Sequence, residues 1–219
     1  MKKQKIIIID YTLGNLFSVQ RAFYNVGANV KISDNKKDIY DADKIVLPGV
    51  GAFSAGMKGL QEKNLSETII KVVNDGKPIL GICLGMQMLM TESEENGLHK
   101  GLNLIKGKVA EFESPTKNDS FKIPHYGWSK VNMPKGTKSN SWDKTLLNGF
   151  SKKNLFCYFV HSYFVNTNNS SHTIGETFYG KNLFASVISY NNITGCQFHP
   201  EKSGEDGLTI INNFVEMKD

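Results

Sequence analysis

Short apolar runs recur along this chain and are separated by polar or glycine-containing stretches. Seven of these runs are four to six residues long and are rich in β-branched and aromatic side chains. Runs of this length and composition are typical of buried strands rather than of helices. They predict β-strands at residues 6–9, 29–32, 44–47, 78–82, 155–160, 184–188 and 195–198.

A different periodicity fills the gaps between the early runs. Apolar residues three or four positions apart, at Leu16, Val19, Phe23 and Val26, predict a helix over residues 15–26. Similar patterns predict helices at 55–74, 84–90 and 207–217. Strands that alternate with helices in this way indicate an α/β fold, with a mostly parallel central sheet flanked by helices on both faces.

The second half of the chain contains more strands and turns, so we expect additional strands beside that sheet. Residues 114–145 are rich in Ser, Lys, Asn and Pro and predict a loop-rich insertion on the surface. No Pro-, Gly- or Ser-rich linker divides the 219 residues, which suffice for one well-buried core. We therefore expect a single domain over residues 1–219.

The net charge of +5 suggests nucleic-acid binding, but the distribution of the charge argues against it. Only one of the 26 basic residues is an arginine, Arg21, and the lysines are scattered, with no base-reading module in sight. The apolar run at 6–9 is too short for a secretion signal, and no other stretch could span a membrane. We expect a cytoplasmic protein that binds neither nucleic acid nor membranes.

The three cysteines, Cys83, Cys157 and Cys196, are odd in number and irregularly spaced. They include no C-x-x-C pair, which argues against a disulfide framework and against a cysteine zinc site. Asp, Glu and His do not recur at ligand spacing either, so we predict no metal and no other cofactor. Cys157 and Cys196 fall in strand patterns and are expected to be core thiols.

Cys83 stands where a predicted strand meets a predicted helix, in the sequence Gly81-Ile82-Cys83-Leu84-Gly85. Glycines two positions before and after it permit the sharp turn of a nucleophile elbow, which exposes the side chain at the end of a central strand. A free cysteine is also a common small core residue. The elbow on its own leaves both interpretations open.

A base, and a group to orient it, follow in the segment 195–201. If residues 195–198 form a strand, positions two apart project to the same side, so that His199 and Glu201 lie side by side at its carboxyl end. Pro200 between them must end the hydrogen-bonded ladder. Because open α/β sheets place their sites at this edge, we predict Cys83 as nucleophile, His199 as its base and Glu201 as the orienting carboxylate.

The strand at 44–47 leads into the turn Pro48-Gly49-Val50-Gly51. It differs from a dinucleotide fingerprint because Ser54 stands where the third glycine would be. Glycines on both sides of Val50 allow a backbone amide to face a ligand. With the amide of Leu84, directly after the nucleophile, this turn would provide two donors for an oxyanion.

These motifs carry a resemblance to a known family. The blocks at 48–51, 81–87 and 199–203 are similar in order and spacing to the signatures of class I (triad-type) glutamine amidotransferases. Four further stretches, at 9–16, 124–128, 158–163 and 207–214, resemble the HisH type of glutaminase subunit of imidazole glycerol phosphate synthases. The resemblance runs over residues 6–214 and implies the single-domain fold of class I glutamine amidotransferases.

The resemblance implies a role for each matching residue. Cys83 would attack the side-chain amide of glutamine, His199 would shuttle the proton and Glu201 would orient His199. Ammonia and glutamate would be released through a thioester at Cys83. The residues implied to hold glutamine or its oxyanion are Gly49, Val50, Gly51, Leu84, Gln87, His161, Ser162 and Tyr163.

The family also implies a partner. Ammonia would pass to a (β/α)8-barrel cyclase of the HisF type, which forms imidazole glycerol phosphate in histidine biosynthesis. The positions that match partner-facing residues of the family are Asn15, Trp128, Tyr158 and Lys202. A glycine-flanked peptide flips at low steric cost, so the turn at 49–51 is a candidate switch for the partner.

Three alternatives remain open from the sequence. Thr12, Leu13 and Ser129 differ from the residues usual in the HisH type. They keep open, as the second choice after the histidine-pathway glutaminase, a HisH-like glutaminase that supplies ammonia to a sugar amidotransferase in surface polysaccharide biosynthesis. A non-enzymatic scaffold is a second alternative, but it would not need nucleophile, base and orienting carboxylate together. A cysteine hydrolase or peptidase is the third, and the implied glutamine pocket argues against it.

Overall fold

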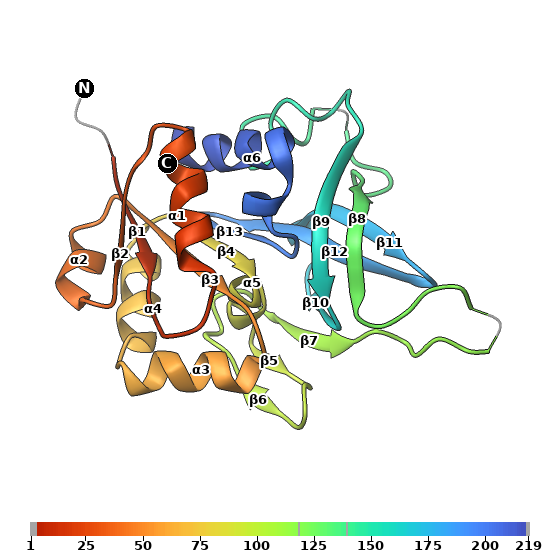
Figure 1. Cartoon of the computed structure of the whole chain (residues 1–219), viewed down its shortest axis with the longest axis horizontal. Helices are drawn as coiled ribbons and strands as arrows, with labels where there is room; N and C mark the ends of the chain where they lie inside the picture. The colour runs from red at the N-terminus through yellow and green to blue at the C-terminus, as the bar shows by residue number, and fades with distance from the viewer. Residues whose placement is uncertain (1–3, 118, 139, 218–219) are drawn as a thin grey trace.

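An eleven-stranded sheet forms the centre of the molecule (Figure 1). The structure is a computed structural model and describes residues 4–117, 119–138 and 140–217, so the outermost ends of the expected domain lie outside the described residues. The order across the sheet is β2 (Asn29–Ser33), β1 (Lys5–Ile9), β3 (Lys44–Gly49), β4 (Ile79–Cys83), β13 (Ile193–Cys196), β12 (Asn182–Tyr190), β10 (Tyr163–Thr167), β7 (Gly107–Glu111), β5 (Glu92–Ser93) and β6 (His99–Lys100), with β11 (Thr173–Tyr179) paired to β12.

The strands from β2 to β13 run parallel to one another. Beyond β13 the neighbouring strands pair antiparallel, except β5 with β7. The prediction of a mostly parallel central sheet with additional strands from the second half is therefore confirmed. It holds because helices connect the early strands, whereas turns connect most of the later ones.

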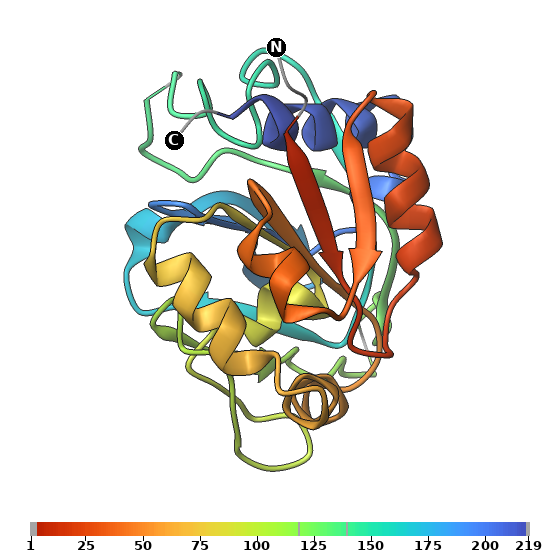
Figure 2. The ribbon, with the colours of Figure 1, turned by 90° about the vertical axis from the view of Figure 1, so that its left-hand side faces the viewer.

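Helices cover both faces of the sheet, as Figures 1 and 2 show. α1 (Leu16–Asn25) and α6 (Gly204–Glu216) pack on one face, and α3 (Phe53–Glu62), α4 (Ser66–Asn74) and α5 (Leu84–Met88) pack on the other. Ile6 and Ile8 of β1 face the first layer, while Ile7 and Ile9 face the second. A strand buried on both faces needs an unbroken apolar run, which explains the four consecutive isoleucines.

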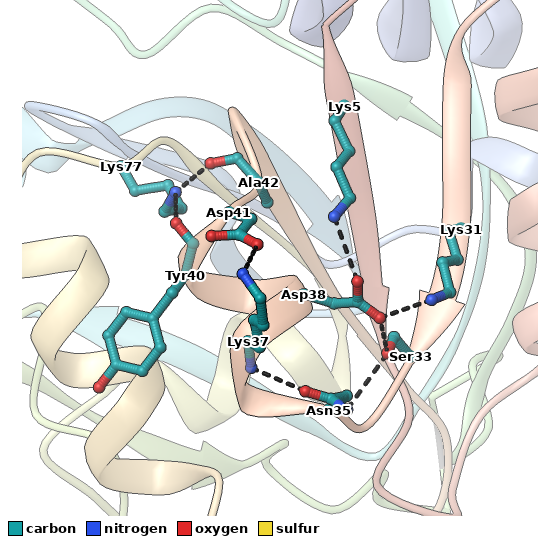
Figure 3. A network of polar contacts seen from close by, with 10 residues as sticks. All are labelled: Lys5, Lys31, Ser33, Asn35, Lys37, Asp38, Tyr40, Asp41, Ala42 and Lys77. Carbon is teal, nitrogen blue, oxygen red and sulfur yellow. Dashed lines mark hydrogen bonds and ion pairs between the residues drawn. The ribbon is translucent and has the colours of Figure 1, made fainter.

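A polar network holds the short helix α2 (Lys36–Tyr40) against the sheet edge (Figure 3). The carboxylate of Asp38 accepts hydrogen bonds from Lys31 Nζ at 2.6 Å, Ser33 Oγ at 2.7 Å and Lys5 Nζ at 3.1 Å. These bonds hold the pKa of Asp38 well below its usual value. Because its donors come from β1 and β2, Asp38 fixes the segment that leads into β3.

One predicted helix was wrong in its extent. Residues 55–74 form two helices, α3 and α4, which are separated at residues 63–65. Asn64 has a positive φ of 54°, and the amide of Leu65 donates to the carbonyl of Leu60 at 2.8 Å. Asparagine tolerates this left-handed conformation, which terminates a helix, so the apolar periodicity continues although the helix does not.

The segment 114–145 is not simply a surface insertion. It contains β8 (His125–Val131), which pairs antiparallel with β9 (Leu155–His161) in a separate two-stranded sheet. Val131 and Trp142 are buried, and Trp142 Nε1 donates to the carbonyl of Ile174 at 2.5 Å. The polar composition of this region concealed a strand that contributes one face to the core.

Candidate active site

Cys83 lies at the end of β4, where the chain turns directly into α5. Its backbone has φ 53° and ψ −111°, a conformation that is rare for a residue with a side chain. A Cβ atom at Gly81 would lie 2.8 Å from Cα of Met86, and one at Gly85 would overlap the carbonyl oxygen of Leu47. The two glycines are thus required for the turn that places the thiol at the sheet edge.

His199 and Glu201 form a buried pair beside this turn. His199 Nδ1 and Glu201 Oε1 are 2.8 Å apart, and their side chains are 3% and 1% exposed. The strand β13 spans Ile193–Cys196, so the predicted strand over 195–198 was placed two residues too far along the chain. The pair is instead formed by the short helix η2 (Pro200–Lys202), whose first residue follows His199. The amide of His199 donates to the carbonyl of Tyr158 at 2.9 Å, which anchors this helix to β9.

The electrostatics of His199 favour its protonated form. Burial lowers the pKa of His199, but its interactions with Cys83 and Glu201 outweigh burial and raise it to about 10. Nε2 of His199 has no hydrogen-bond partner among the described residues. His199 is therefore positioned between a sulfur on one side and a carboxylate on the other.

A cavity of about 300 Å³ opens at Cys83. Its wall is formed by the turn after β3, by Cys83 and the start of α5, by the end of β9 with the two residues that follow it, and by His199. The lining residues are Val50, Gly51, Cys83, Leu84, Gln87, Glu95, Pro124, Val160, His161, Ser162, Tyr163 and His199. Nine of the residues named from the sequence thus meet in one place, while Gly49 and Glu201 support the cavity from behind.

Gly49 pairs with Cys83 in the register of β3 and β4. A Cβ atom at Gly49 would overlap the hydroxyl of Tyr11, which donates to the carbonyl of Pro48 at 2.6 Å. Gly51 has φ 95° and open space where a side chain would be. Gly49 is thus required by packing and Gly51 by backbone conformation, and Val50 between them is exposed at the mouth of the cavity.

Three residues near the site were missed by the sequence analysis. Tyr11 supports the turn at Gly49, Glu95 lines the cavity and accepts from the amide of Phe53 at 2.7 Å, and Gln197 Nε2 lies 3.6 Å from Cys83 Sγ. Glu95 belongs to an acidic stretch that looks like solvated surface. Gln197 lies two residues before His199, in a segment that the sequence already marks as part of the site. This closeness to the predicted histidine is the signal that could have identified it.

Two of the four residues predicted to face a partner lie on the antiparallel hairpin of β8 and β9. Trp128 is opposite Tyr158 in the register, and their rings are 6.3 Å apart in an edge-to-face arrangement. Lys202 Nζ lies 5.6 Å above the ring of Tyr158. Asn15 is exposed at the start of α1, next to Gly14, which packs against Gly49. Two of the four therefore sit on one hairpin, with Lys202 directly beside it.

No group of three His, Cys, Asp or Glu side chains in the described parts of the chain could hold a metal ion. Over the same residues, no helix is long and apolar enough to cross a membrane.

A parallel sheet with a cysteine at a strand-to-helix turn, a buried His–Glu pair and a glycine-rich turn beside it defines a class of protein. The family model described as "Glutamine amidotransferase class-I" matches residues 7–217, and the chain belongs to this family. The family expected from the motif blocks is thereby confirmed.

Within this family, the chain is most usefully compared with proteins named as HisH subunits. A HisH subunit of imidazole glycerol phosphate synthase from Methanosarcina acetivorans is 47% identical over 98% of this chain and 99% of its own length. The subunit of the same name from Sulfurimonas denitrificans is 43% identical over 97% of this chain and 98% of its own length. The resemblance to the HisH type is therefore confirmed over the full length of both chains.

Solved structures agree on the fold. PurLQS from Thermotoga maritima matches with a TM-score of 0.68 at 17% identity, covering 98% of both chains. A structure described as glutamine amidotransferase matches with a TM-score of 0.69 at 14% identity, covering 92% of this chain and 94% of the other. At these identities the likeness concerns the fold alone.

Proposed function

We propose that this chain is the glutaminase subunit of an imidazole glycerol phosphate synthase. It hydrolyses glutamine at Cys83 and delivers ammonia to a (β/α)8-barrel cyclase of the HisF type in histidine biosynthesis. The observation that carries this proposal is the full-length similarity, at 43–47% identity, to relatives named as HisH subunits of that synthase. The cavity at Cys83 supports it, because nucleophile, base and implied glutamine pocket meet there.

The geometry supports an acyl-transfer mechanism. His199 takes up the proton of the Cys83 thiol, and the sulfur attacks the carboxamide carbon of glutamine. Amide N–H groups of Val50 and Leu84 hold the oxyanion of the tetrahedral intermediate. His199 then gives its proton to the nitrogen, the C–N bond breaks, and ammonia leaves a γ-glutamyl thioester on Cys83.

Water completes the cycle. It attacks the thioester carbon while His199 accepts one of its protons, and the C–S bond breaks to release glutamate and restore the thiol. Glu201, 2.8 Å from Nδ1, keeps the ring of His199 oriented and stabilises the imidazolium in both halves of the reaction. The pKa of His199, near 10, means that the proton resides on the ring at neutral pH and is available to the leaving nitrogen.

Delivery of ammonia requires a docked partner, because free ammonia is mostly protonated in neutral water and is then not a nucleophile. We assign the docking surface to the β8–β9 hairpin, where Trp128 and Tyr126 are exposed, together with Asn15, Tyr158 and Lys202. A cytoplasmic location suits the three cysteines, which are buried and unpaired. The sugar-amidotransferase alternative gains no support from the relatives from Sulfurimonas denitrificans and Methanosarcina acetivorans, whose names refer to imidazole glycerol phosphate synthase.

The test is glutamate release from glutamine by the purified chain. It is measured alone, with the cyclase barrel of the same organism, and with that barrel plus its ribonucleotide substrate. We expect strong stimulation in the complete mixture and its loss, by at least about a thousandfold, in Cys83→Ala, since the nucleophile carries the whole reaction. Thermal unfolding of the variant checks that the chain is folded.

Absence of stimulation, with Cys83 still labelled by a glutamine-like electrophile, would contradict the histidine-pathway partner and leave the glutaminase. Absence of both stimulation and labelling would contradict the glutaminase itself.

A further inference from the structure

A chain of buried hydrogen bonds leads from the inner face of β8 to the wall of the cavity. The side chains of His125 and His161 are both buried, and His125 Nδ1 lies 3.1 Å from His161 Nε2. At one end, His125 Nε2 lies 2.8 Å from Ser129 Oγ. At the other end, His161 Nδ1 lies 2.8 Å from the carbonyl oxygen of Tyr163. The proposed mechanism uses neither His125 nor Ser129.

The carbonyl of Tyr163 fixes the direction of this chain, because a carbonyl oxygen only accepts. His161 must therefore carry a proton on Nδ1. Burial, reinforced by the neighbouring His125, lowers the pKa of His161 to about 3, so the ring is neutral and its Nε2 is an acceptor. His125 must then donate from Nδ1. Burial lowers the pKa of His125 to about 4, so its Nε2 accepts in turn from the hydroxyl of Ser129.

The same carbonyl orders the amides on the other side of the cavity. Gln87 Nε2 donates to the carbonyl of Tyr163 at 2.9 Å and to Oε1 of Gln197 at 3.1 Å. Gln197 then directs its own Nε2 at Cys83 Sγ, at 3.6 Å. Both amide hydrogens of Gln87 are committed in this way, and the residue itself lines the cavity.

We propose that Ser129 and His125 are positioning residues of the glutaminase site, which hold the ring of His161 in place and, through the Tyr163 carbonyl, the amide orientations of Gln87 and Gln197 beside Cys83. This proposal rests on the proposed function, because it assigns the two residues to the same reaction. It goes beyond that function in placing control of the pocket on a strand that does not itself carry the nucleophile or base.

β8 connects this chain of hydrogen bonds to the molecular surface. Residues alternate along the strand, so that His125 and Ser129 face inward while Tyr126 and Trp128, 69% and 56% exposed, face outward. A protein bound to the outer face of this strand touches the element whose inner face sets the pocket. A small shift of β8 would therefore change the alignment of the amides at the glutamine pocket.

The first arm of the test reads the tautomers directly. In full-length protein with 15N-labelled histidine, long-range 1H–15N spectra show which ring nitrogen carries the proton. We expect both His125 and His161 to be protonated on Nδ1, although a free neutral imidazole prefers Nε2. In Ser129→Ala, His125 should keep its proton on Nδ1, because His161 Nε2 is still its acceptor, but the 15N shift of His125 Nε2 should move as the hydroxyl donor is lost. Ser129→Thr, which keeps the hydroxyl, should restore that shift.

The second arm measures glutamine hydrolysis by the complex with the cyclase barrel. His125→Phe keeps the ring that stacks between Phe159 and Tyr179 but leaves His161 Nε2 without its donor. We expect KM for glutamine to rise about tenfold in His125→Phe and about fivefold in Ser129→Ala, with kcat changed by less than about twofold. Ser129→Thr should return KM to within about twofold of the original.

Ser189→Ala is the matched control, because it deletes a half-buried hydroxyl on β12 outside this chain of hydrogen bonds. It should alter neither KM nor the histidine spectra. A proton on Nε2 of His161 in the unmodified protein would overturn the proposal, as would Ser129→Ala with an unchanged His125 Nε2 shift and an unchanged KM. If the complex releases no glutamate at all, the proposed function fails, and the spectra still decide the hydrogen-bond chain.

Discussion

At the scale of single residues, two unusual conditions coincide at the end of β4. Cys83 has a positive φ, and His199 carries a raised pKa although it is buried. The positive φ costs free energy and is tolerated where the surrounding structure imposes it, whereas strongly shifted pKa values are typical of functional sites. The turn is imposed by the packing of Gly81 and Gly85, and the charge on His199 is stabilised by Glu201.

The raised pKa of His199 predicts a pH dependence of stability. Its ordinary pKa of 6.5 rises to about 10 in the folded chain, so the folded state holds a proton that the unfolded state loses between these values. The stabilisation is complete below pH 6.5 and is lost as the pH rises to 10. We expect this loss to be smaller in Glu201→Gln, whose side chain is neutral.

Urea unfolding at pH 6.5 and pH 9.5 gives the unfolding free energies of the unmodified protein and of Glu201→Gln. The buried thiols of Cys157 and Cys196, whose pKa values are raised by burial, add a similar slope to both, so the difference between the proteins reports His199. Equal losses of unfolding free energy in the two proteins would contradict the assignment of the proton to His199.

At the scale of elements, a buried lysine on β3 secures the last helix. Lys44 Nζ donates to the carbonyls of Phe214 at 2.9 Å, Val215 at 2.8 Å and Met217 at 2.5 Å. Carbonyls at the end of a helix have no partner within it, and a cation there also interacts favourably with the helix dipole. α6 follows η2 directly, so the same contact helps to hold the His199–Glu201 segment against the sheet.

We therefore expect Lys44→Met to destabilise the fold by about 2–3 kcal/mol, because it leaves these carbonyls without their donor. Lys58→Met is the control, since Lys58 pairs with Glu62 in an exposed contact at 3.6 Å. That change should cost less than about 0.5 kcal/mol. Urea unfolding distinguishes the two, and equal effects would mean that Lys44 does not cap α6.

At the scale of the whole molecule, the site lies where the parallel sheet meets the β8–β9 hairpin. The sheet contributes Cys83 and the turn after β3, and the segment that follows β9 contributes Ser162 to the opposite wall. The amide of His199 donates a hydrogen bond to the carbonyl of Tyr158 in β9, so the hairpin is connected to the segment that carries His199 and Glu201. A partner on the hairpin is therefore well placed to influence the chemistry.

Trp128→Ala should weaken binding of the cyclase barrel about thirtyfold, as expected for an exposed aromatic anchor, without lowering the melting temperature. Tyr190→Ala is the control. Tyr190 is exposed beside Ile193, which pairs with Ile79 at the start of β4, and thus lies at the edge of the sheet opposite Cys83. Titration by calorimetry compares the two, and equal affinities would remove Trp128 from the interface.

Local rules explain why part of this fold can be predicted from the order of the amino acids. The isoleucines at 6–9, the alternation of strand and helix, and the glycines around Cys83 and Val50 act over a few residues, through burial and backbone sterics. These rules are enough to predict the parallel sheet and the turn that presents the thiol. The same locality explains the error at 55–74, where apolar periodicity persists through a left-handed residue, Asn64.

Contacts between distant segments follow from the packing of the whole chain and could not be predicted. The strand β8 was hidden in a polar segment because its inner residues are separated along the chain from the aromatic rings they contact. The His199–Glu201 pair depends on η2 rather than on a longer strand, and the contacts of Gln197 with Gln87 and Cys83 join positions more than a hundred residues apart. Side-chain hydrogen bonds over such separations leave no periodic trace in a sequence, since packing of the whole chain fixes them.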